Sequence, residues 1–406
     1  MNDSDRHRAG FEAFTRTAAA RERLLEAVSP TARTERVALR AADDRVVATA
    51  IEADRPVPHY ERAAMDGYAV RASDTFGASE QSPASLRVTD TVRAGTATRV
   101  HTGSELPEGA DAVVMVEATD RAGDELSVFE AVPEGGNVGP VGEDVGEGQQ
   151  LFEAGHCLRP SDLGLLKAVG LETVEVYARP QVSVAPTGEE LVQSDPAPGE
   201  ILETNGQTVT QYVERWGGEA TYRDIVTDDA DELRAAVERD LDHDIVVTTG
   251  GSSVGDRDIV PEVVGELGEV FVHGVALKPG HPVALGAVEG TPVLMLPGYP
   301  VACIVNAVQF LRPAVETAGR RPAVSLPTTD ARLTRKIPSE PGVRTFARVT
   351  LDEDGDGERT ATPTRTKGAG VLSSVALADG WVVVSEEREG YAEGNTVAVE
   401  EWEGCR

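Results

Sequence analysis

The stretch 244–300 gathers hydroxyl, acidic and basic side chains around glycines, a combination that suits a phosphate-bearing ligand held with a metal ion. Three glycine-containing loops occur in it, beginning near Gly250, Lys278 and Pro297, and each comes after a strand-like run. Because the carboxyl ends of parallel strands meet at one edge of a sheet, we expect these loops to lie together. The sequence therefore predicts a nucleotide-like phosphate site. Its candidate residues are Gly250, Gly251, Ser252, Ser253, Gly255, Asp258, Lys278, Gly280, Pro297 and Gly298.

The loop at Gly250-Gly251 matches neither the Walker A pattern nor the dinucleotide fingerprint. Successive backbone N–H groups at such a strand-to-helix transition can bind an anion, although a tight turn alone would also require glycine. Acidic residues such as Glu190 and Asp258 would repel a polyphosphate unless a divalent cation lay between them, and oxygen ligands of this kind favour Mg²⁺. The alternative is that these acids belong to a generally acidic surface.

Two further residues stand out by type. The chain has only four lysines, so Lys278 inside a Pro-Gly loop indicates a need for a compact positive charge, unless it is an incidental surface lysine. Asp66 follows an extended segment with two prolines and precedes Gly67, which permits a bend. A carboxylate at that bend could bind a ligand or simply form the turn.

The composition excludes several classes of protein. The 406 residues include 69 acids and 38 basic residues, for a formal charge of -31, and the acids are spread along the chain. We interpret this as a surface adapted to high salt, with a polyanion-repelling protein as the alternative, and nucleic-acid binding is not expected. The three cysteines are far apart, the N-terminus lacks an apolar segment, and no apolar run could span a membrane. The expected location is the cytoplasm.

The pattern along the chain predicts an α/β protein with several domains. Strand-like and helical segments alternate over 179–322, which favours a three-layer α/β nucleotide-binding domain with a parallel-rich sheet. Short strands between turns predict a small β-module inserted at 52–140 into a first domain of residues 1–51 and 141–178. Residues 323–406 predict a terminal β-barrel-like domain, with strands that include 370–375.

Several ordered segments resemble the molybdopterin molybdenumtransferase (MoeA) family, which includes the enzymatic domain of gephyrin. They cover nearly the whole chain and read PHYERAAMDGYAV, HTGSELPEGADAVVMVE, PTGEELV, EILETNGQTV, TTGGSSVGDRD, LKPGHPVALG, LPGYPVA and KGAGVLSSVALADG. The resemblance implies insertion of molybdate into adenylylated molybdopterin, with release of AMP, by a homodimer that uses a divalent cation. It also implies the domain order described above.

The resemblance also assigns roles to individual residues. Asp66 is the acid of the Ala-Met-Asp-Gly-Tyr segment and Lys278 the first lysine of the usual Lys-Pro-Gly-Lys-Pro, and together with Asp258 they are the expected catalytic residues. Glu190 and Asp258 are the expected magnesium ligands. The substrate-binding residues implied in addition to the glycine loops are Thr102, Asn205, His281, Arg348 and Ser374.

This sequence departs from the family at positions that bear on oxyanion capture. His281 stands where the second lysine is usual, Tyr299 replaces an asparagine and Ala302 replaces a serine. Ser252 replaces a valine, and residues 137–141 lack the usual arginines. Neutral histidine would hold molybdate more weakly than lysine. The alternatives are therefore a tungstate-preferring insertase, a non-catalytic molybdopterin-binding paralogue and, less in keeping with the full domain set, a general nucleotide-pyrophosphate hydrolase.

Overall fold

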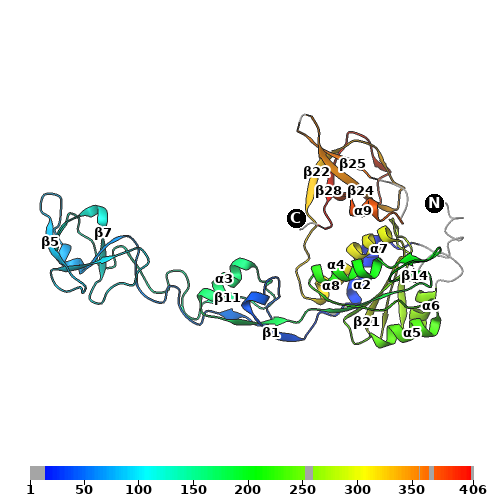
Figure 1. The fold of residues 1–406 in the computed structure, drawn as a ribbon, viewed down its shortest axis with the longest axis horizontal. Coiled ribbons are helices and arrows are strands. Elements are labelled where there is room, and N and C mark those ends of the chain that lie inside the picture. The colour runs from blue at the N-terminus through cyan, green and yellow to red at the C-terminus, as the bar shows by residue number, and fades with distance from the viewer. Residues whose placement is uncertain (1–13, 252–258, 356, 365–369, 404–406) are drawn as a thin grey trace. The chain divides into compact units, whose positions relative to one another are not determined.

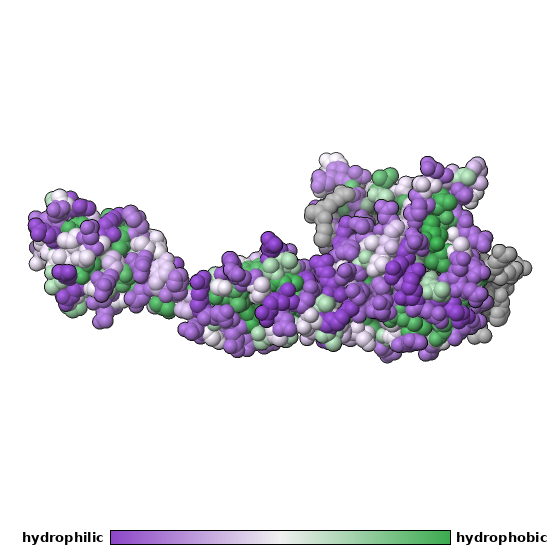
Figure 2. All heavy atoms as spheres, turned by 60° about the horizontal axis from the view of Figure 1, so that its bottom comes forward, coloured by the Kyte–Doolittle hydropathy of each residue, from purple (hydrophilic) through white to green (hydrophobic). Residues whose placement is uncertain are grey.

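The computed structural model describes residues 14–251, 259–355, 357–364 and 370–403. The chain divides into two compact units, one made of Met1–Thr34 and Tyr177–Arg406 and the other of Glu35–Val176. Among the described residues, every helix is too short or too polar to cross a membrane. Hydrophilic residues cover most of the face shown in Figure 2, as the charged composition requires.

The first unit contains a six-stranded sheet with the order β16-β13-β17-β21-β20-β18. Its first four strands are parallel, and β20 and β18 each run antiparallel to the preceding neighbour. Regular alternation of strand and helix gives the parallel part, because parallel strands need crossover connections. The strands are β13 (Gln181–Pro186), β16 (Glu219–Tyr222), β17 (Ile245–Thr249), β18 (Glu269–His273), β20 (Ala284–Val288) and β21 (Thr291–Leu296).

Helices cover both faces of this sheet (Figure 1). Ile245 and Val247 of β17 belong to one hydrophobic core and Val246 to another, as the two-residue period of a strand requires. All three are almost fully buried, which explains their continuous apolar run. The predicted three-layer domain is confirmed. One face carries α2 (Thr17–Ala27), α4 (Asn205–Arg215), α7 (Pro300–Asn306), the π-helical segment η4 (Ala307–Leu311) and α8 (Arg312–Ala318), and the other carries α5 (Ala230–Arg239) and α6 (Ile259–Leu267).

The end of the chain forms the predicted β-barrel, in which five strands close in the order β24-β25-β22-β28-β26 and back to β24. A further short strand, β19 (Leu277–Lys278), comes from the α/β part and pairs with β24 in parallel. The barrel strands are β22 (Thr328–Leu333), β24 (Arg344–Glu353), β25 (Arg359–Pro363), β26 (Gly380–Val384) and β28 (Thr396–Glu400). A short ladder joins β23 (Ile337–Pro338) to β27 (Gly390–Tyr391).

The second unit holds the predicted β-module, a six-stranded sheet with the order β7-β4-β6-β5-β9-β8. Alternate residues of β4, Tyr68 and Val70, belong to one apolar core, and Ala69 belongs to another. The sheet strands are β4 (Gly67–Val70), β5 (Ala84–Val88), β6 (Thr96–Val100), β7 (Ala112–Met115), β8 (Thr119–Ala122) and β9 (Glu125–Val128). The unit also contains α3 (Pro160–Ala168), three 3-10 helices and three two-stranded ladders, the ladders being β1 (Thr34–Ala38) with β12 (Thr173–Tyr177), β2 (Ile51–Glu52) with β11 (Gln150–Phe152) and β3 (Arg62–Ala63) with β10 (Val138–Gly139).

Two local predictions need comment. The strand expected at residues 370–375 is wrong: this part of the chain contains a one-turn helix, α9 (Ser373–Ala376), whose Ser374 and Val375 are buried. Val375 packs into the large core that includes the α/β layers, and this packing decides the local structure there, since a β-branched residue in an apolar run fits either state. The helix expected near the N-terminus is α2, and the predicted residues before position 14 lie outside the described part.

Candidate functional site

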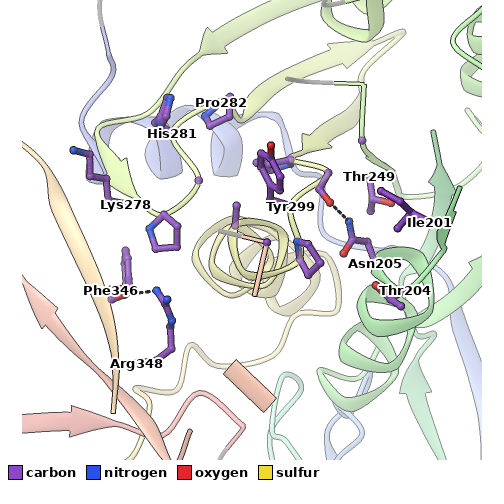
Figure 3. A pocket seen from close by; sticks show the side chains of 18 of the residues that line it. Ile201, Thr204, Asn205, Thr249, Lys278, His281, Pro282, Tyr299, Phe346 and Arg348 are labelled. Carbon is purple, nitrogen blue, oxygen red and sulfur yellow. Dashed lines mark hydrogen bonds between the residues drawn. The ribbon is translucent and has the colours of Figure 1, made fainter. Parts of the chain in front are cut away.

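One cavity of about 1020 Å³ in the first unit collects most of the predicted site residues (Figure 3). It lies where β13, β17 and β21 end, and the residues that follow these strands, Thr187, Gly250 and Pro297, line it. This is the edge at which open α/β sheets bind ligands. Barrel residues line the cavity too, among them Glu340, Phe346 and Arg348.

The segment 277–282 reaches this cavity by a route that the sequence argument did not foresee. It begins with β19, which pairs with a barrel strand, and leads into β20. Since β20 is antiparallel to β21, its first residue, Ala284, pairs with Met295 near the end of β21. The three glycine loops therefore meet, although only two of them follow strands of the six-stranded α/β sheet.

Close backbone packing makes glycine necessary in the loop after β17. Gly250 has φ +111°, and a Cβ there would lie 2.1 Å from the carbonyl oxygen of Thr187. Gly251 has φ +63°, and its added Cβ would lie 3.0 Å from the Thr187 hydroxyl. The hydroxyl oxygens of Thr187 and Thr249 are buried and have no hydrogen-bond partner within the described part of the chain. Unsatisfied hydroxyls on a cavity wall suit a ligand that carries polar oxygens.

The wall beside this loop is fixed by the start of α4. Asn205 Nδ2 donates to the carbonyl oxygen of Gly298 at 2.7 Å (Figure 3). The Glu203 carboxylate accepts from Gly206 N at 2.7 Å and from the Tyr222 hydroxyl at 2.5 Å, so it caps the helix. Burial, followed by the bond to Glu203, raises the pKa of Tyr222.

Basic side chains occupy the opposite part of the cavity in Figure 3, where Lys278, His281 and Arg348 are labelled. Lys278 Nζ lies 2.8 Å from Glu340 Oε2. Burial and the charge of Lys278 lower the pKa of His281, so its ring is neutral at pH 7. Arg348 is only 3% exposed, and burial lowers the pKa of its guanidinium, which nonetheless remains protonated. Such a group of donors suits a tetrahedral oxyanion.

Tyr299 lies between the glycine loop and the basic side chains in Figure 3. It is 61% exposed, which is unusual for a large aromatic ring on a cavity wall. A Cβ added to Gly370 would be 3.3 Å from this ring, so the barrel approaches it closely. An exposed ring here offers a flat apolar surface to a heterocycle.

Glu190 also lines the cavity and is exposed. Among the described residues, no group of three or more His, Cys, Asp or Glu side chains is arranged to hold a metal. Magnesium needs less than that, because it commonly takes one or two carboxylates and completes its shell with water and substrate phosphates. Glu190 fits this role. The second predicted ligand, Asp258, lies outside the described residues, as do the predicted site residues Ser252, Ser253 and Gly255.

Ser374 is not among the cavity residues. Its hydroxyl donates to the carbonyl oxygen of Val371 at 2.7 Å, and its own carbonyl oxygen accepts from the Thr364 hydroxyl at 3.2 Å. Both bonds are local contacts that hold α9. Ten other predicted residues do line the cavity, namely Glu190, Asn205, Gly250, Gly251, Lys278, Gly280, His281, Pro297, Gly298 and Arg348.

Asp66 and Thr102 form a pair in the second unit. The Asp66 Oδ1 atom accepts from Thr102 N at 2.7 Å and from Thr102 Oγ1 at 2.8 Å. His101 Nδ1 lies 3.6 Å from Asp66 Oδ2. The backbone N–H and then the hydroxyl of Thr102 lower the pKa of Asp66, so this exposed carboxyl is ionised at neutral pH.

Sequence reasoning missed Glu203, Glu340, Thr187 and Thr249. Glu203 precedes a helix start by two residues, a position at which an acid could have been identified as a cap. Thr249 is the last residue of β17, and Thr187 is the first residue after β13. No sequence pattern marks Glu340 as a site residue, because its partner Lys278 lies 62 residues earlier in the chain.

Comparison with known proteins gives a consistent result along the chain. Three family models match: the MoeA N-terminal region (domains I and II) at residues 15–170, a probable molybdopterin binding domain at 183–317 and the MoeA C-terminal region (domain IV) at 330–402. A putative molybdopterin biosynthesis protein of Methanocaldococcus jannaschii is 36% identical over 93% of this chain and 94% of its own length.

Enzymes and solved structures agree with these matches. The molybdopterin molybdenumtransferase of Bacillus subtilis is 33% identical, over 90% of this chain and 89% of its own. A crystal structure of the molybdopterin biosynthesis MoeA protein from Pyrococcus horikoshii superposes with a TM-score of 0.82 at 33% identity, covering 97% of this chain and all of that one. The similarity thus extends over every domain.

Proposed function

The chain belongs to the MoeA family and is a molybdopterin molybdenumtransferase of molybdenum cofactor biosynthesis, and from this premise we propose how its cavity performs the reaction. Adenylylated molybdopterin binds in the cavity, molybdate is inserted into the dithiolene, and AMP is released. The observation that carries the proposal is that one cavity contains both the Gly250–Gly251 loop and the basic residues Lys278 and Arg348.

In this proposal the two ends of the cavity bind different anionic groups. The phosphates lie against the loop at Gly250, where an approaching ligand meets no Cβ and where the hydroxyls of Thr187 and Thr249 lack partners within the described residues. The oxyanion lies at Lys278 and Arg348. Positive charges at the place where negative charge gathers lower the barrier.

Magnesium is the proposed cation, held by Glu190 together with Asp258 and substrate phosphates. When bound, it would neutralise phosphate charge and polarise the phosphoanhydride. Glu190 itself contributes by placing a carboxylate on the wall that the glycine loop shares. Asn205 orients the Gly298 backbone on the same wall through its 2.7 Å hydrogen bond.

Asp66 is the proposed catalytic carboxylate of the second unit, and its Thr102 contacts keep it ionised. We propose that the protein is a homodimer in which Asp66 of one subunit serves the cavity of the other. The support is the family resemblance of the segment that contains Asp66.

His281 favours a second candidate function. Its neutral ring gives the cavity one positive charge fewer than a lysine would. A tungstate-preferring insertase, or a paralogue that binds molybdopterin without turnover, would tolerate that loss.

The deciding experiment measures AMP release from adenylylated molybdopterin with molybdate or tungstate, at several salt concentrations. AMP release with molybdate supports the proposal. Tight pterin binding without AMP release by either oxyanion supports the binding paralogue.

A complementation test addresses the dimer. Asp66→Asn and Lys278→Met should each abolish AMP release, with Lys336→Met as an exposed lysine control that keeps it. Refolding the two inactive variants together should restore about a quarter of the activity, since half of randomly paired dimers contain one intact cavity of two. No recovery, despite mixed dimers, would place Asp66 in the cavity of its own subunit.

A further inference from the structure

Lys278, the lysine of the proposed oxyanion site, already has an anionic partner from the barrel. Its Nζ lies 2.8 Å from Oε2 of Glu340, and both residues line the cavity. The bond to Lys278 is the main cause of a lowered Glu340 pKa, so the carboxyl group is ionised at neutral pH. An incoming oxyanion therefore meets a lysine that a carboxylate occupies.

Both residues lie on backbone segments that are anchored to the barrel. Lys278 is in β19 and pairs with Thr345 of β24. Glu340 begins a turn in which Val343 N donates to its carbonyl oxygen at 3.1 Å, and Gly342 N donates to Glu386 O at 2.7 Å.

The residue before Glu340 anchors the same turn. The Ser339 hydroxyl lies 2.8 Å from that of Thr345, the residue that pairs with Lys278. Ser339 N also donates to the carbonyl oxygen of Glu389 at 2.9 Å. The turn that carries Glu340 is thus anchored beside the β19–β24 pairing that holds Lys278.

The ion pair is nevertheless weak enough to open. The side chains of Lys278 and Glu340 are 39% and 48% exposed. Solvent screening limits such exposed pairs to a small net stabilisation. Arg348, by contrast, is almost fully buried on the same cavity wall.

We propose that Glu340 is an internal competitor for the oxyanion site: its carboxylate occupies Lys278 in the empty enzyme and is displaced by the substrate oxyanion. This rests on the proposed function, in which Lys278 and Arg348 bind the oxyanion. A tetrahedral dianion that contacts both Lys278 and Arg348 is attracted more strongly than the singly charged carboxylate of Glu340 and can displace it. Chloride is attracted less strongly and displaces it less readily. Glu340 therefore limits the occupation of Lys278 by chloride in the empty enzyme, at some cost in molybdate affinity.

The test is calorimetric titration of the full-length protein with molybdate, before and after Glu340→Gln. Removing the competitor should tighten molybdate binding roughly two- to fivefold, the range expected for an exposed ion pair. Glu358→Gln is the matched control, since it breaks another exposed barrel ion pair, with Arg332, and changes the net charge equally. This control should leave the affinity unchanged.

Chloride provides the second measurement. When chloride replaces gluconate at constant ionic strength, molybdate binding by Glu340→Gln should weaken by a larger factor than binding by the wild type, because only the wild type carries its own competitor. Unchanged or weaker molybdate binding by Glu340→Gln would overturn the inference.

Lys278→Met separates the inference from the function on which it rests. In that background the added Glu340→Gln substitution should have no effect on molybdate binding, and an undiminished gain would overturn the inference. If the wild type and Lys278→Met bind molybdate equally, the proposed oxyanion site itself is refuted. If Lys278→Met alone loses binding while Glu340→Gln changes nothing, only the competitor role is refuted.

Discussion

The side-chain amide of Asn205 donates to the carbonyl oxygen of Gly298 at 2.7 Å. This bond joins the first residue of α4 to the loop that follows β21, two elements separated by 93 positions in the chain. A Cβ on Gly298 would lie 3.4 Å from the Gly250 Cα, so the same loop also touches the glycine loop after β17. The amide of Asn205 thus positions one wall of the cavity.

Asn205→Asp should weaken substrate binding and leave the fold intact. The substitution replaces the donor with a carboxylate that repels the Gly298 carbonyl, a loss of about 1–3 kcal/mol. KM for adenylylated molybdopterin should rise about tenfold, with little change in Tm. Gln207→Glu, on the same helix and exposed, is the control and should keep the wild-type KM. Equal KM values for the two variants would show that the amide does not position the loop.

The sequence predicted the α/β layers because local pattern and burial agree there. Ile245, Val246 and Val247 are buried on the two faces of the sheet. Three consecutive apolar residues between turn signals are typical of a strand that is covered on both faces. The segment at 370–375 shows the limit of this reasoning. Packing against the core that includes the α/β layers makes α9 from residues that also suit a strand.

The candidate site was predictable only where its residues lie in recognisable local motifs. The loop glycines and Lys278 stand in such motifs, and the cavity contains them. Glu340 and Glu203 bond to the side chains of Lys278 and Tyr222, which are distant in sequence. Only the folded structure shows that these pairs are close. Lys278 itself approaches the cavity through a pairing between β19 and barrel strand β24, which no spacing rule indicates.

Gly250→Ala should destabilise the protein and abolish phosphate binding. Its φ of +111° disfavours any side chain, and the new Cβ would lie 2.1 Å from the Thr187 carbonyl oxygen. We expect the free energy of unfolding to fall by about 2 kcal/mol or more. Gly164→Ala is the contrasting control, because Gly164 is exposed within α3 and an added Cβ meets no atom within 4 Å. It should stabilise the protein by up to about 1 kcal/mol. Chemical denaturation and AMP binding measure both effects, and a stable, AMP-binding Gly250→Ala protein would contradict the assignment.

His281 should make molybdate binding depend on pH. Burial and Lys278 lower its pKa, so the ring is neutral at pH 8 and gains a proton only when the pH falls below its usual range near 6.5. Molybdate affinity should therefore rise as the pH falls from 8 towards 5. The lowered pKa of His281 also reduces the free energy of unfolding as the pH falls, because His281 binds a proton more readily in the unfolded chain than in the folded protein.

His281→Lys should remove this pH dependence and tighten molybdate binding at pH 8 by about tenfold, since the lysine is charged throughout. His273→Lys is a suitable control, because His273 is an exposed residue of β18 that does not line the cavity. A wild-type affinity that stays constant from pH 8 to 5, or a similar gain in the control variant, would exclude His281 from oxyanion binding.

The acidic composition predicts a strong dependence of stability on salt. With a formal charge of -31, the folded protein carries self-repulsion that the expanded unfolded chain relieves. Raising KCl from about 0.1 to 1 M shortens the screening length from about 10 to 3 Å and should raise Tm markedly. Near the isoelectric point the net charge vanishes, so the same salt increase should change Tm much less. A polyanion-repelling protein of a low-salt environment would already be fully stable at 0.1 M KCl. A Tm that is flat between these salt concentrations at neutral pH would therefore reject salt adaptation and favour that alternative.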